Sequence, residues 1–258
     1  MPEIHPTACV EDGAILADDV VVGPFTFVGR EVELGPRVEV GAHVTLMGRT
    51  RIGADCRIFP QACLGGEPQD RAFDGESTRL EIGARTQIRE QVTIHVGTSR
   101  GGGCTRIGED NYLMNGAHIG HDCQIGDHTI IASFCGLAGH ARVDDFAVLG
   151  AYTGLHQHAR VGESVMAAGG SKLSLDAPPF SMVAGDRARL VGLNSVGLRR
   201  RGLPPETCRQ IKRAFHLIFR SRLRLEEALA RVGAELGGVP EVERLVSFLR
   251  KTERGFCR

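Results

Sequence analysis

The sequence predicts a parallel β-helix, an all-β fold, followed by a small α-helical domain. Three observations support this prediction. An aliphatic residue recurs at every sixth position over most of the chain, glycine is frequent at 34 of 258 residues, and the period becomes helical near residue 205. A period of six fits neither an α-helix nor an ordinary strand, whose side chains repeat every 3.6 and 2 residues.

The repeat of six predicts three flat faces per turn of the chain. The aliphatic phase runs through residues 4–64, 82–94 and 107–173, and the fourth residue after each aliphatic one is usually small. Three hexads make a coil of 18 residues, in which the aliphatic residue points inward and the small residue completes the interior. Glycine often follows the aliphatic residue, and we expect it to supply backbone freedom at the corners.

Two breaks in the phase predict loops outside the β-helix, at about 65–81 and 95–106. Loops on a rigid scaffold are common places for function. The β-helix is expected to occupy residues 1–186, and the remainder, 187–258, is expected to be helical.

Three segments of the tail have apolar residues at helical spacing: 204–221, 223–238 and 240–255. Residues 191–258 hold 15 Lys and Arg against 7 Asp and Glu, whereas the rest of the chain holds 16 against 24. A basic tail on an acidic body predicts an anionic partner for the tail.

Composition excludes several classes of protein. No secretory signal and no apolar run of about 20 residues is present, so we expect a cytoplasmic protein without stable membrane insertion, and no nucleic-acid partner. The eight cysteines form no CxxC motif. Cys56, Cys123 and Cys135 occupy the small-residue position of the hexad, which predicts reduced core residues.

Histidines gather in the stretch NGAHIGHDC (115–123) and on the two following coils. Because residues 18 apart are stacked, His140 and His158 should lie one above the other, and His121 one step aside on the same edge. Three interpretations stay open from the residues: polar surface, a zinc site shared between subunits, or a catalytic base supported by Asp122.

Several motifs around these histidines resemble the UDP-N-acetylglucosamine O-acyltransferase family, in order and over essentially the whole chain. They are GEPQD (66–70), IREQVTIH (88–95), GGGCTRIG (101–108), NGAHIGHDC (115–123), LAGHARVDDF (137–146), LHQ (155–157) and NSVGLRRRG (194–202). The resemblance implies a left-handed parallel β-helix of hexapeptide repeats and a homotrimer with active sites between subunits. It also implies transfer of a 3-hydroxyacyl chain from acyl carrier protein to the sugar 3-hydroxyl of UDP-N-acetylglucosamine, the first step of lipid A synthesis.

The resemblance also implies the roles of individual residues. His121 would be the general base, Asp122 its partner, and the Gly139 N–H the donor to the oxyanion. Gly169 would limit acyl length, and no metal or diffusible cofactor is implied. The acidic acyl carrier protein would be the partner of the basic tail. The remaining implied substrate contacts are Asp70, His118, His140, His156, Gln157, Asn194, Arg200 and Arg201.

Two positions depart from the family pattern on the acceptor side. Ala72 stands where the family usually has Lys, with Arg71 beside it, and Val196 stands where Glu is frequent. Transfer to the 3-amino analogue, or to another UDP-sugar, therefore stays open. So do a zinc hydro-lyase of the carbonic anhydrase type and a scaffold that binds nucleotide-sugar without turnover. His158 is not a family residue.

Overall fold

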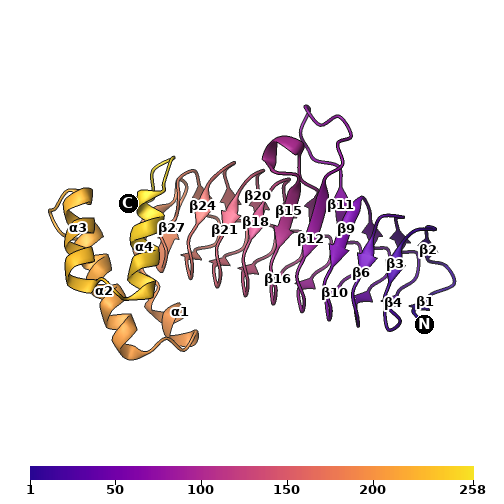
Figure 1. Cartoon of the computed structure of the whole chain (residues 1–258), viewed down its shortest axis with the longest axis horizontal. Helices are drawn as coiled ribbons and strands as arrows, with labels where there is room; N and C mark the ends of the chain where they lie inside the picture. The colour runs from indigo at the N-terminus through magenta and orange to yellow at the C-terminus, as the bar shows by residue number, and fades with distance from the viewer.

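A computed structural model describes all 258 residues of the chain. Figure 1 shows a straight rod of stacked coils with the N-terminus at one end and a group of helices at the other. The rod has three faces, because consecutive strands belong to three different parallel sheets.

The three sheets, here called A, B and C, contain 11, 9 and 8 strands. Sheet A comprises β1 (Glu3–Ile4), β4 (Val21–Val22), β7 (Glu39–Val40), β10 (Arg57–Ile58), β13 (Gln87–Ile88), β16 (Tyr112–Leu113), β19 (Ile130–Ile131), β22 (Val148–Leu149), β25 (Met166–Ala167), β27 (Ser181–Ala184) and β28 (Arg189–Leu193). Sheet B comprises β2 (Cys9–Val10), β5 (Phe27–Val28), β8 (Thr45–Leu46), β11 (Cys63–Gly66), β14 (Thr93–His95), β17 (His118–Ile119), β20 (Gly136–Leu137), β23 (Gly154–Leu155) and β26 (Lys172–Leu173). Sheet C comprises β3 (Ile15–Leu16), β6 (Glu33–Leu34), β9 (Arg49–Ile52), β12 (Arg79–Ile82), β15 (Cys104–Ile107), β18 (Gln124–Ile125), β21 (Arg142–Val143) and β24 (Arg160–Val161).

The core of the rod follows the hexad phase. Ile119 and Leu137 pair across β17 and β20 and are fully buried, while their strand neighbours His118 and Gly136 face outward. The small residue of the hexad is buried as well, and there burial raises the pKa of the Cys123 thiol to about 12. All eight cysteines are free. The predicted inward positions are therefore confirmed, and Cys123 is a core residue.

The hexad glycines do not serve mainly to give backbone freedom at the corners, so that expectation was wrong. The left-handed backbone lies three residues after the aliphatic one and is occupied mostly by other residues, such as Arg37 and Asp122. Except for Gly65, where the first loop begins, the glycine directly after the aliphatic residue has no positive φ, but a Cβ at Gly23 or Gly53 would lie 2.8 or 2.7 Å from the backbone of the next coil. Close stacking of turns, and not backbone freedom, requires glycine there.

The two interruptions leave the rod on one side. The first connects β11 to β12, and the second connects β14 to β15 through a single 3₁₀ turn, η1 (Ser99–Gly101). Figure 1 shows both standing out together above the rod. A hydrogen bond of 3.0 Å from Ser99 Oγ to Glu76 Oε1 joins them. They therefore form one projecting unit over the middle coils.

The rod ends where β28 turns back antiparallel to β27. Four helices follow: α1 (Ser195–Arg200), α2 (Pro205–Phe219), α3 (Leu225–Leu236) and α4 (Pro240–Arg250). The last three correspond to the predicted segments, whereas the short α1 was not predicted. The helices have a hydrophobic core of their own, into which Phe180 inserts from the last coil. The boundary expected at residues 186 and 187 stays a prediction, and β28 lies on its helical side.

Candidate active site

The strongest candidate for chemistry is the pair His121 and Asp122, at the corner between sheets B and C. Nδ1 of His121 lies 2.8 Å from Oδ2 of Asp122, and only 1% of the Asp122 side chain is exposed. A carboxylate at that nitrogen fixes the proton on Nδ1 and leaves Nε2 as the acceptor. Nε2 makes no hydrogen bond to the protein. The pair therefore presents a basic nitrogen supported by a buried charge.

The second loop holds Asp122 in place. Thr98 donates to the carboxylate twice, from its backbone N–H at 2.9 Å and from its hydroxyl at 2.7 Å. A Cβ on Gly101 would lie 2.0 Å from the carboxyl carbon of Asp122, so this position has no room for a side chain. Sequence reasoning missed Thr98, because a contact between a loop and a coil leaves no periodic signal.

Gly139 lies against the His121 ring one coil further on. A Cβ there would lie 2.5 Å from both Cε1 and Nε2 of His121. The Gly139 N–H makes no hydrogen bond within the protein. Its hexad position lies outside the hydrogen-bond ladder, as shown by Pro24, Pro36 and Pro60, which have no N–H and occupy the same position on other coils. A free amide donor therefore stands beside the free nitrogen of His121.

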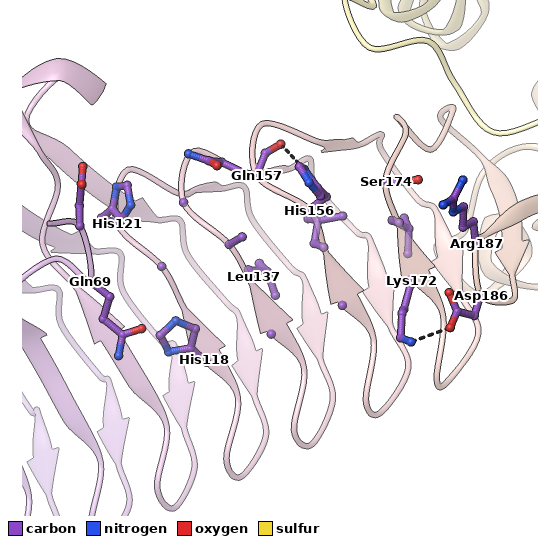
Figure 2. A pocket seen from close by; sticks show the side chains of 18 of the residues that line it. Gln69, His118, His121, Leu137, His156, Gln157, Lys172, Ser174, Asp186 and Arg187 are labelled. Atoms are coloured by element: carbon purple, nitrogen blue, oxygen red, sulfur yellow. Dashed lines mark hydrogen bonds and ion pairs between the residues drawn. The ribbon is translucent and has the colours of Figure 1, made fainter. Parts of the chain in front are cut away.

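A groove of about 950 Å³ runs from His121 along the outer face of sheet B. Its floor is bare, because Gly136 pairs with Gly154 at the outward position of two successive strands. Figure 2 shows side chains placed along the face of these coils. Six of the predicted site residues line the groove: Asp70, His118, His121, Gly139, His156 and Gln157.

His118 marks the near end of the groove. Its Nδ1 lies 2.9 Å from the hydroxyl of Thr93, and burial, with a smaller contribution from His95, lowers the pKa of its imidazole. His156, further along, has Nδ1 3.0 Å from the carbonyl oxygen of Gln157 and 3.2 Å from Nη2 of Arg254. These two contacts need different tautomers, so only one of them is a hydrogen bond at a time.

The far end of the groove is charged, which sequence reasoning missed. Nζ of Lys172 lies 2.5 Å from Oδ2 of Asp186, with Arg187 beside them (Figure 2). Lys172 precedes the buried Leu173 in β26, so its side chain faces outward. Its partner lies beyond the last regular hexad, so the ion pair could not be predicted.

His140 and His158 confirm the predicted ridge of imidazoles. The ring of His140 lies edge-on to His121 at 5.0 Å between centroids and is stacked on His158 at 4.4 Å. His140 does not line the groove. It lies over the corner, in a second hollow on sheet C that is also lined by Asp122 and His158 and by several arginines. The ridge therefore separates two faces of the rod.

The other predicted substrate residues lie elsewhere on this chain. Asn194 caps α1, using Oδ1 for the Gly197 N–H and Nδ2 for the Ser164 carbonyl. Arg201 pairs with Glu163 at the corner between sheets C and A, opposite the groove, and Arg200 beside it is exposed and unpaired. Gly169 lies at the corner between sheets A and B, outside the groove lining.

His121, Asp122 and His140 are the group that could hold a metal ion, since their ligand atoms lie within 4.8 Å of one another. The donors are engaged differently, however. Oδ2 of Asp122 already accepts from His121 and from the Thr98 hydroxyl. A zinc ion would have to displace the Nδ1–carboxylate contact. The donor set fits a hydrogen-bonded pair better than a metal site.

Comparison with known proteins decides the family. A family model described as UDP N-acetylglucosamine O-acyltransferase, domain 2, matches residues 176–257, and one for bacterial transferase hexapeptide (six repeats) matches 104–139. The acyl-[acyl-carrier-protein]–UDP-N-acetylglucosamine O-acyltransferase of Thermodesulfovibrio yellowstonii is 43% identical over 258 residues, the whole of both chains. The chain belongs to the UDP-N-acetylglucosamine O-acyltransferase family. The Thiobacillus denitrificans relative of the same name is 46% identical over the same length.

Solved structures of the UDP-N-acetylglucosamine O-acyltransferase family have the same fold. LpxA from Acinetobacter baumannii is 38% identical and superposes with a TM-score of 0.95, covering 99% of each chain. The enzyme from Arabidopsis is 32% identical with a TM-score of 0.87, covering 99% of this chain and 100% of its own. The fold is thus a left-handed parallel β-helix with a small helical domain, as predicted. The carbonic-anhydrase alternative is not favoured.

Proposed function

We propose that this chain transfers a 3-hydroxyacyl group from acyl carrier protein to the 3-hydroxyl of UDP-N-acetylglucosamine, the first step of lipid A synthesis. One observation carries the proposal: the free Nε2 of His121 and the free N–H of Gly139 lie side by side at the head of a long groove. Acyl transfer needs both a base for the attacking hydroxyl and a donor for the oxyanion.

The steps follow from this arrangement. Nε2 of His121 takes the proton of the sugar 3-hydroxyl while the hydroxyl oxygen bonds to the thioester carbon. Asp122 stabilises the resulting imidazolium of His121. The carbonyl oxygen becomes an oxyanion and accepts a hydrogen bond from the Gly139 N–H. The C–S bond then breaks, and the thiolate of the carrier takes the proton back from His121. The proton taken from the sugar hydroxyl ends on the carrier thiol, and His121 returns to its neutral form. The proposal includes no metal and no diffusible cofactor.

The groove is proposed to hold the acyl chain and part of the sugar. Gly136 and Gly154 leave a bare floor on the outer face of sheet B. Asp70, His118, His156 and Gln157 bring polar atoms to the same groove, as ligand sites require for orientation. His140, which lies on the ridge and outside the groove, would act through His121 and Asp122. Gly169, outside the lining, keeps its role in acyl length as a prediction.

A homotrimer is part of the proposal, because one chain does not bring its predicted residues together. Asn194, Arg200 and Arg201 lie at the corner opposite the groove. A neighbouring copy can place its arginines at this groove, where a guanidinium suits a diphosphate. An equal mixture of His121→Ala and Arg200→Ala chains, unfolded and refolded together, is then expected to regain about a quarter of wild-type activity. At random assembly, about a quarter of the interfaces combine a chain that keeps His121 with a neighbour that keeps Arg200. Recovery of none would indicate that both residues serve one chain's own site.

Acyl carrier protein is proposed to bind the helical tail. Arg209, Lys212, Arg213 and His216 of α2 line one hollow together with Arg231 of α3, and Lys212 and His216 have no acidic partner there. An acidic carrier would be attracted to such a surface, mainly through its rate of association. The longest helix, α2, has 15 residues, and none of the helices could span a membrane. The cytoplasmic location stays a prediction.

The identity of the acceptor depends on the two positions that depart from the family pattern, Ala72 and Val196. Ala72 is uncharged and is not part of the groove lining, whereas Arg71 lines the groove. Val196 is half exposed on α1. Mass spectrometry of the product made from UDP-N-acetylglucosamine and from its 3-amino analogue, each with carriers bearing different chains, separates an ester from an amide product. Failure of both acceptors would contradict the proposal and favour a binding scaffold.

The mechanism has its own test. His121→Ala is expected to lose nearly all kcat while keeping its fold, measured by circular dichroism and by the elution volume of the assembly. His43→Ala is a matched control, since His43 is a corner histidine far from the groove. A His121→Ala variant that keeps most of its activity would rule out this base.

A further inference from the structure

His158 extends the catalytic pair by a stack that runs along the ridge. Asp122, His140 and His158 occupy the same corner position on three successive coils and share a left-handed backbone, with φ of 60°, 62° and 63°. The rings of His140 and His158 are nearly parallel, 8° apart, while His140 meets His121 at 88°. His158 therefore touches the catalytic base only through His140.

His140 is a competitor for the carboxylate that supports the base. Its Nδ1 lies 3.8 Å from Oδ2 of Asp122, the same oxygen that lies 2.8 Å from Nδ1 of His121. A protonated His140 would be drawn to this oxygen and would weaken its bond to His121. A neutral His140 leaves Asp122 to His121. The protonation state of His140 therefore affects how strongly Asp122 supports His121.

The surroundings of His140 favour the neutral ring. Burial lowers the pKa of His140, Asp122 opposes this, and the like charges of His158 and His121 add to the lowering. His158 covers one face of the ring, and only 22% of the His140 side chain is exposed. Asp70 also acts on His140, and the other charged groups that line the same hollow as the two rings are Arg79, Arg100, Arg106, Arg142, Asp144, Asp145, Arg160, Asp176, Lys251, Glu253 and Arg254.

We propose that His158 is a positioning residue of the transfer reaction. By covering His140 it holds that ring edge-on to His121 and keeps Asp122 available to His121 alone. The inference rests on the proposed function and adds a residue that the family resemblance does not supply. His158 is not a catalytic residue, since it contacts neither His121 nor the groove.

Two variants test this role. His158→Ala removes the cover, and it is expected to lower kcat about threefold to tenfold, the size of one aromatic pair, with little change in KM. Because an uncovered His140 binds its proton at higher pH, the acid limb of the kcat/KM profile should move to higher pH. His158→Phe keeps a ring over His140 and should restore most of kcat.

A second readout does not depend on activity. This readout is NMR of protein that carries an isotope label at histidine. The His140 signal is assigned by its absence from the spectrum of His140→Asn, and it should titrate at higher pH in His158→Ala than in wild type. Wild-type kcat and an unchanged acid limb in His158→Ala would overturn the inference. So would equal losses in the Ala and Phe variants accompanied by a lower melting temperature, because the stack would then serve stability alone. A wild-type protein inactive with every acceptor would instead overturn the proposed function, and the inference with it.

Discussion

The imidazole of His121 lies directly over Gly139 of the next coil, so close that a Cβ on Gly139 would overlap its ring at 2.5 Å. The two residues come from consecutive coils, at positions that the hexad repeat brings to one corner. Their contact brings the proposed base next to the proposed amide donor, with no side chain between them. The His121 ring can therefore take this position only because residue 139 has no side chain.

Gly139→Ala tests this contact. Alanine keeps the N–H but must push the His121 ring away, and a displacement of about 1 Å is expected to lower kcat about a hundredfold. The measurement is kcat with saturating donor and acceptor, together with the melting temperature. Gly233→Ala on α3, where a Cβ also meets nothing within 4 Å and which lies outside the groove, is the matched control for activity. Equal kcat in the two variants would contradict the assigned geometry.

Thr98→Val should weaken the support of Asp122. The isosteric side chain removes the 2.7 Å bond from the Thr98 hydroxyl to the buried carboxylate and leaves the backbone bond in place. A hydrogen bond to a charged group contributes about 1.5 kcal/mol or more, so kcat should fall about tenfold. Ser99→Ala removes a hydroxyl from the adjacent exposed position and should leave kcat unchanged. A loss confined to Ser99→Ala would indicate that the loop acts through Glu76 instead.

Lys212→Glu should affect the carrier and not the sugar. It reverses a charge in the basic hollow of α2, so KM for acyl carrier protein is expected to rise several-fold at low salt, and less at high salt, where screening shortens the range of the charges. KM for the nucleotide-sugar should stay the same. Arg30→Glu, the same reversal near the N-terminal end of the rod, controls for net charge. A rise in both KM values would place the carrier elsewhere.

His118 should lower the stability of the protein as the pH falls from 7.5 to 5.5. Burial lowers the pKa of His118 in the folded state, so the unfolded chain binds more protons near its ordinary value of about 6.5. This contribution is present above pH 6.5 and is lost as the pH falls through the folded-state pKa. Melting temperatures of wild type and His118→Gln at the two pH values check it. Identical pH dependence in both proteins would mean that His118 does not carry the effect.

Removal of metal ions should leave acyl transfer unchanged. Asp122 is already satisfied by Thr98 and by His121, and the proposed steps balance protons without an ion. Activity is compared before and after dialysis against a chelator, with and without added zinc. Loss on chelation and recovery with zinc would revive the metal interpretation of His121, Asp122 and His140.

Much of the fold and part of the site could be predicted because the hexad repeat is a geometric rule. It placed Ile119 inside, and His121, His140 and His158 on one ridge, from counting alone. The same counting misread the hexad glycines, since it describes position within a coil but not the distance between coils. It also gave no account of Thr98 or of Asp186, because loops and the end of the rod follow no period. The separation of Arg200 from the groove is a property of the assembled chain, which spacing within one coil does not reveal.

Each coil of the rod contacts mainly the coils before and after it, with the site confined to the middle and last ones. Gain or loss of 18 residues near the N-terminus would lengthen or shorten the rod and leave every catalytic neighbour in place. Gain or loss of six would turn all later faces by one third of a revolution against the earlier ones. In this architecture, the rod can change length during evolution in steps of whole coils without altering the contacts within the site.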